Sequence, residues 1–264
     1  MRHFAEVLSQ RKYNLREELR AIEKLFNGDS PVFSMYKHLR SNFLQWHLRN
    51  NYVDLDTFLE ETGIRGILFK ATHANDVPLE DYLYYCEYML NVTEFLIPYK
   101  LSNSRYVIEN ITNTLEQLNY KPHFSGNVWH IIEKDVLVNE AAEVVETNYD
   151  LGESIYSFNY RETQGNINKK ADILCRLYKY IESITPQAKQ YGFETMLDDI
   201  KDLMNKLDVR HAATAKQAAV IEGMDADEYE NWLDELFRLS LSLIVLVDYR
   251  AKRKDIKELK SKLG

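Results

Sequence analysis

An arginine and a histidine lie next to each other at Arg210 and His211, where a predicted helix ends before a loop of small residues. An arginine guanidinium binds a phosphate through parallel N–H bonds, and histidine is the side chain that most readily transfers a proton near neutral pH. The two residue types therefore suit phosphodiester cleavage without a metal ion. The alternative is that both side chains only cap the last carbonyl groups of the helix.

Arg40 and His47 form a second arginine–histidine pair. Residues seven apart in a continuous helix lie on one face, so these two side chains are expected to point the same way. The stretch around them is rich in aromatic residues, which is also typical of a helix that packs into a core. On that alternative, Arg40 and His47 only flank a packed stripe.

The sequence does not contain the residue patterns that other kinds of catalysis require. The two cysteines, Cys86 and Cys175, have no histidines at the short spacing of a zinc site. The sequence has no glycine-rich phosphate loop and no Gly-x-Ser-x-Gly elbow. Helical spacing spreads four acids that are close together in sequence around the surface rather than gathering them on one face: Asp198, Asp199, Asp202 and Asp208. We therefore expect no metal site, no cofactor and two buried thiols without a redox role.

The composition is that of a globular protein built mostly from helices. The 264 residues are 45% hydrophobic and include only 9 Gly and 5 Pro. The net charge of -8 argues against a generally basic nucleic-acid-binding surface. The C-terminal tail nevertheless has a basic run that either complements the helix macrodipole or binds phosphate: Arg250, Lys252, Arg253, Lys254, Lys257, Lys260 and Lys262. No signal sequence or bilayer-spanning stretch is visible, which predicts a cytoplasmic protein without a membrane partner.

Apolar periodicity and capping residues predict the helices, and a turn signal at Ser125-Gly126-Asn127 predicts a β-hairpin between them. The expected helices cover residues 14–26, 31–48, 54–59, 76–95, 104–118, 139–161, 168–190, 193–207 and 225–263. The predicted fold class is mainly α, with a helical N-terminal region (1–119), a hairpin connection (120–138) and an antiparallel helical bundle (139–264). The last helix is apolar on more than one face between Trp232 and Val247, which predicts a symmetric homodimer.

The part of the chain after residue 149 resembles the C-terminal HEPN domains of abortive-infection proteins, which act in bacterial phage defence. Its matching stretches are Ile155–Asn159, Ile167–Leu174, Leu203–His211 and Glu230–Phe237, and the Val209-Arg210-His211 step is the most specific. The resemblance implies a dimerising all-α bundle, often a metal-independent ribonuclease. In that superfamily an arginine, a polar residue and a histidine about four to six residues after the arginine form the active motif. Arg210 and His211 match the first two positions, whereas positions 215–217 contain no histidine.

Two functions therefore follow as expectations. The first is a HEPN-like bacterial defence or toxin protein that cleaves RNA without a metal ion, with Arg210 and His211 as catalytic residues and Arg40 and His47 as the second candidates. The alternative is a catalytically inactive HEPN-like module for dimerisation or sensing, which binds RNA or a protein partner. The expected partners are RNA, a second copy of the chain, and an antitoxin or a phage-derived trigger.

Overall fold

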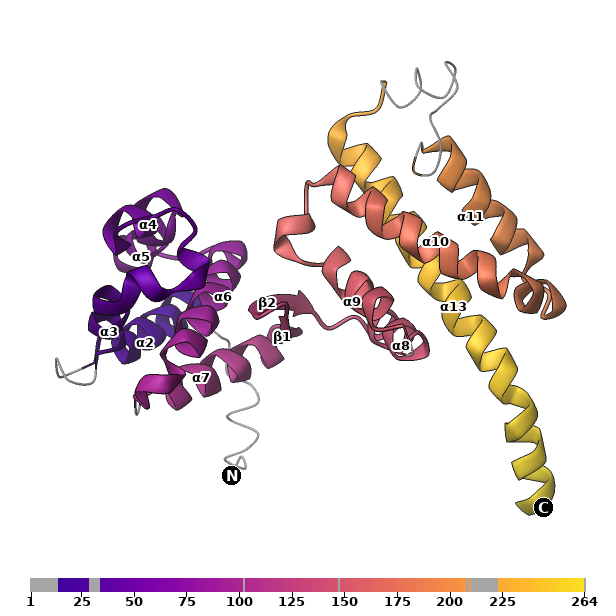
Figure 1. The fold of residues 1–264 in the computed structure, drawn as a ribbon, viewed down its shortest axis with the longest axis horizontal. Helices are drawn as coiled ribbons and strands as arrows, with labels where there is room; N and C mark the ends of the chain where they lie inside the picture. The colour runs from indigo at the N-terminus through magenta and orange to yellow at the C-terminus, as the bar shows by residue number, and fades with distance from the viewer. Residues whose placement is uncertain are drawn as a thin grey trace. The chain divides into compact units, whose positions relative to one another are not determined.

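The computed structural model describes residues 14–28, 34–101, 103–146, 148–207, 209 and 223–263. The fold is mainly α-helical with a two-stranded hairpin, as the sequence predicts (Figure 1). The chain divides into two compact units, Met1–Ile131 and Ile132–Gly264. Each unit has a hydrophobic core of its own. The boundary falls within the second strand of the hairpin.

The first unit is a group of helices packed around α6 (Leu79–Leu96). Side chains on several faces of α6 are buried, among them Tyr82, Cys86 and Leu90, as expected for a helix in the centre of a core. The surrounding elements are α2 (Leu15–Asn27), α3 (Met35–Asn42), α4 (Leu55–Glu61), α5 (Ile64–His73), α7 (Asn103–Gln117) and the 3-10 turns Phe43–Gln45, His47–Arg49 and Ile97–Tyr99.

The predicted helices differ from the structure in three places. The helix expected to continue to residue 48 ends at Asn42, because the chain turns to bury Trp46 among the rings of Phe43 and Phe58. Helix α5 begins at Ile64, directly after Gly63, and lies outside every predicted helix. The single helix expected over 139–161 is two helices, α8 (Val136–Val144) and α9 (Tyr149–Phe158), the second of which is capped by the Asn148 side chain.

The hairpin comprises β1 (Tyr120–Ser125) and β2 (Val128–Glu133). Gly126 and Asn127 both have positive φ, as the tightest hairpin turns require. The Asn91 side chain of α6 makes two hydrogen bonds with the backbone of Trp129, of 2.8 and 2.9 Å. Glu87 of α6 accepts a third, from the backbone N–H of Ile131 at 2.9 Å. These bonds dock the hairpin on a helix, which a lone hairpin needs for stability.

The second unit contains α8, α9, the long helices α10 (Ile167–Gln190) and α13 (Ala226–Leu263), α11 (Glu194–Lys206) and the 3-10 turn Arg161–Thr163. Helix α13 packs against α8, α10 and α11, and this explains why it is apolar on more than one face. Its side chains Leu233, Leu236 and Leu241 are completely buried within one chain. The homodimer therefore stays a prediction that this apolar stretch alone does not support. Within the described part of the chain, no helix is both long and apolar enough to cross a membrane.

The two thiols differ in their surroundings. Cys86 is fully buried, as predicted, and burial raises the pKa of its thiol to about 12. Cys175 was also expected to be buried, but it is only partly so, and its Sγ donates a hydrogen bond of 2.9 Å to the Val209 carbonyl.

We expect native Cys86 to resist alkylation, because the thiolate is the reactive form and the buried thiol stays protonated at neutral pH. Pulse labelling with iodoacetamide and mass spectrometry should find Cys86 labelled only after denaturation, while Cys175 reacts earlier. Labelling of Cys86 as fast as Cys175 in the folded protein would contradict this assignment.

Candidate functional site

Arg210 and His211 lie outside the described residues, so the candidate site is defined by the residues on either side of them. Val209 is buried, and its N–H donates a hydrogen bond of 3.1 Å to the Met204 carbonyl. Its carbonyl accepts the bond from Cys175 of α10. The Tyr229 hydroxyl of α13 donates a bond of 2.5 Å to the Leu207 carbonyl. The backbone that leads into Arg210 is thus tied to α10, α11 and α13.

A buried lysine lies at the same end of the unit. Lys170 of α10 has no exposed surface, and its Nζ lies 2.7 Å from a Glu230 carboxylate oxygen and 2.5 Å from one of Asp234. Both acids belong to α13, and Glu230 directly follows the Tyr229 that holds Leu207. The ammonium also lies 5.1 Å from the ring centre of Phe158. This ion-pair cluster joins α9, α10 and α13 beside the Val209 anchor.

The carboxylate of Glu230 is held in its charged form. Burial alone would raise its pKa, but hydrogen bonds from Lys170 and from the backbone N–H of Gly165, together with the Lys170 charge, lower the pKa below its ordinary value. The Gly165 bond is 2.8 Å long. Lys170 therefore has an ionised partner at neutral pH, which a buried ammonium requires.

Sequence reasoning did not identify Lys170 or its two acids. Lys170 lies three, four and seven residues before Ile173, Leu174 and Leu177, which are all buried on α10. A lysine on the buried stripe of a helix is a signal that an acid lies opposite. The acids are about sixty residues later in the chain, so only the fold shows which ones they are.

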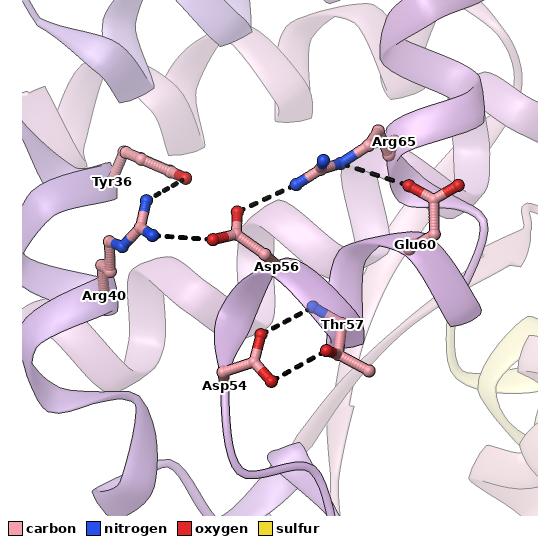
Figure 2. A network of polar contacts seen from close by, with 7 residues as sticks. All are labelled: Tyr36, Arg40, Asp54, Asp56, Thr57, Glu60 and Arg65. Carbon is pink, nitrogen blue, oxygen red and sulfur yellow. Dashed lines mark hydrogen bonds and ion pairs between the residues drawn. The ribbon is translucent and has the colours of Figure 1, made fainter.

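Arg40 belongs to a polar network on the first unit (Figure 2). Its guanidinium lies 2.7 Å from Asp56 and donates a second bond of 3.3 Å to the Tyr36 hydroxyl. Asp56 also pairs with Arg65 at 2.9 Å. Asp54, beside it, caps α4 through its bonds to Thr57. The charge of Arg40 is thus largely satisfied by structural partners.

The expectation that Arg40 and His47 share a helical face is wrong. Helix α3 ends at Asn42, and His47 lies in a separate 3-10 turn where its side chain is exposed. A cavity of about 370 Å³ beside Arg40 is lined by residues from 40–45 and 53–56, and His47 is not one of them. The two side chains are therefore not assembled into one site.

Arg40→Ala is expected to lower the free energy of unfolding by no more than about 1 kcal/mol, because exposed ion pairs contribute little. Urea unfolding followed by circular dichroism measures this change. A loss of several kcal/mol would show that the network in Figure 2 holds the first unit together.

Metal ligands are not gathered in the part of the chain that the structure describes: no three His, Cys, Asp or Glu side chains there form a group that holds an ion. Comparison of the whole chain with protein-family models, with curated proteins and with solved structures gives no match. A function is therefore inferred from the chain's own residues.

Proposed function

We propose that the chain is a HEPN-like bacterial defence or toxin protein that cleaves RNA without a metal ion, with Arg210 and His211 as its catalytic residues. Arg210 stabilises the charge that develops on the scissile phosphate. His211 moves the proton of the attacking 2′-hydroxyl or of the leaving group. The proposed site of action is the cytoplasm, where the RNA is, and each copy of the chain in a homodimer has its own Arg–His pair.

The observation that supports this proposal most is the fixed backbone before Arg210. Catalysis by a cation and a proton carrier requires both to be held close to the reacting geometry. Val209, directly before Arg210, is buried and bonded through both its N–H and its carbonyl. The Lys170 cluster stiffens the ends of α10 and α13 beside it. A surface helix end that only capped carbonyl groups would not need such an anchor.

A catalytically inactive HEPN-like dimerisation or sensing module is the second candidate. Exposed carboxylates lie at the start of α13, at the same end of the unit: Asp225 directly precedes the helix, and Asp227 and Glu228 are in its first turn. Negative charge there repels RNA phosphates and favours a protein partner, such as an antitoxin or a phage-derived trigger. The absence of a histidine at positions 215–217 favours the same candidate.

Induced expression in a bacterium separates the two candidates. The nuclease proposal predicts that the wild-type chain arrests growth and that Arg210→Ala, at the same protein level, does not. Arg238→Ala is the matched control, because it removes an exposed arginine from the same unit. Growth arrest that persists with Arg210→Ala would favour the interaction module instead.

A further inference from the structure

The C-terminal third of α13 extends past the hydrophobic core of the second unit, and its contacts with that unit lie near its start, where Arg250 stacks over Phe193 at 6.0 Å. Helix α13 is 38 residues long, about 57 Å at the rise of an α-helix. We call its residues 249–263 the overhang: every side chain described there is exposed, and the end of the helix extends beyond α8, α10 and α11 in Figure 1. A helical segment of this length is marginal in water without packing.

The overhang nevertheless has an apolar stripe. Ile256, Leu259 and Leu263 are 41%, 57% and 78% exposed. With Val245, Tyr249 and Lys252 they form a series at alternating steps of four and three residues. This spacing is that of the seam by which two helices pair in a coiled coil. An exposed seam of this kind on a helix indicates a missing partner helix.

The first half of this stripe also lines a groove. The groove has a volume of about 890 Å³ and lies between α8, α9 and α13. Its apolar lining includes Val144, Val245 and Tyr249. Its charged lining consists of five acids and one base: Glu140, Glu143, Glu146, Glu153, Asp248 and Lys252. Burial raises the pKa of Tyr156 in the groove, and the charges of Glu143 and Glu153 raise it further. The groove is therefore a site of negative potential.

The overhang has the opposite charge. Its sequence contains seven basic residues (Arg250, Lys252, Arg253, Lys254, Lys257, Lys260 and Lys262) against two acids, Asp255 and Glu258. One chain thus has both an acidic groove with an apolar floor and a basic helix with an apolar stripe. When each of two chains gives its basic helix to the acidic groove of the other, the two contacts close into a two-fold pair.

We infer that the groove and the overhang form a homodimer interface, in which the overhang of each chain lies antiparallel along α13 in the groove of the other. The stripe is symmetric about position 254, so this pairing sets Val245 opposite the partner's Leu263 and Tyr249 opposite the partner's Leu259. Asp248, which lines the groove and pairs with Lys252 of its own chain at 2.8 Å, then also faces the partner's Lys260. This inference depends on the charges and the stripe, and it holds whether or not the protein cleaves RNA.

Light scattering of the full chain at tens of micromolar tests the stripe. The wild type is expected to have twice the mass of one chain. Leu259→Glu should give a folded monomer, because Leu259 is exposed within one chain but faces the partner's Tyr249 in the seam. Val136→Glu, which adds the same charge to the exposed N-terminus of α8 outside the groove, should remain a dimer. A monomeric wild type, or a dimer that Leu259→Glu does not weaken, would overturn the interface.

Charge reversal tests the pairing of groove and overhang. Glu143→Lys with Glu153→Lys, and separately Lys257→Glu with Lys260→Glu, should each weaken dimerisation by about tenfold or more. All four changes together should restore at least part of the lost affinity, since the charges are then exchanged. Sedimentation equilibrium measures the dissociation constants. If both double variants dimerise more weakly and the fourfold variant recovers no affinity, the basic residues do not pair with the groove. A monomeric wild type whose overhang binds RNA would likewise assign the basic residues to another partner.

Discussion

Lys170→Ala is expected to lower the free energy of unfolding of the second unit by about 3 kcal/mol, the lower end of the range for breaking a buried ion pair. Lys170 is completely buried, and its loss leaves Glu230, whose side chain is only 18% exposed, without a cation. We do not expect the upper end of that range, because the side chain of Asp234, the second acid, is 43% exposed and water can solvate it. The substitution also removes the ammonium that lies 5.1 Å from the ring centre of Phe158.

Lys169→Ala is the matched control for this prediction. Lys169 is the preceding residue of α10 and pairs with Glu162, but both side chains of that pair are substantially exposed. Its loss should cost less than about 1 kcal/mol. Urea unfolding by circular dichroism measures both variants. Equal losses would show that burial does not distinguish the two lysines and that the cluster does not stabilise this end of the unit.

The ion-pair cluster of Lys170, Glu230 and Asp234 should also make the free energy of unfolding depend on pH. The pKa of Glu230 is lower in the folded protein than its ordinary value of 4.5. The contribution of the Glu230 carboxylate to the free energy of unfolding is therefore fully present above pH 4.5. It is lost as the pH falls below that value and through the pKa in the folded protein. Urea midpoints measured between pH 6 and pH 3 should fall more steeply for the wild type than for Lys170→Met. Parallel curves for the two proteins would contradict this linkage.

Arg210→Ala and His211→Ala are each expected to reduce RNA cleavage by roughly two to four orders of magnitude with the fold intact. Arg210→Lys should recover only part of the activity, because lysine keeps the charge but loses the planar two-bond contact with phosphate. The Arg40→Ala variant should cleave RNA at the wild-type rate, because the Arg40 guanidinium is paired with Asp56 and not with a substrate. Initial rates on labelled RNA measure these effects. A full rate for His211→Ala would assign proton transfer to another residue.

The sequence predicted those parts of the fold that depend on neighbouring residues. The hairpin follows from Gly126-Asn127 between two β-favouring runs, and the long helices follow from their apolar periodicity. The end of α3 at Asn42 was not predictable in this way, because it depends on burying Trp46 against Phe58, a residue of another helix. The same limit applies to the candidate site. Local pattern singled out Arg210 and His211, whereas the pairing of Lys170 with two acids of α13 depends on the packing of distant helices.

Cleavage of RNA by the purified wild-type protein in EDTA is the most direct test of the proposed function. We predict that labelled RNA is cut without added metal, that the products end in a cyclic or 3′ phosphate, and that DNA of the same sequence stays intact. These results follow because the internal 2′-hydroxyl is the nucleophile when no metal-activated water takes part. Cleavage that requires magnesium, or that Arg210→Ala performs at the wild-type rate, would contradict this prediction.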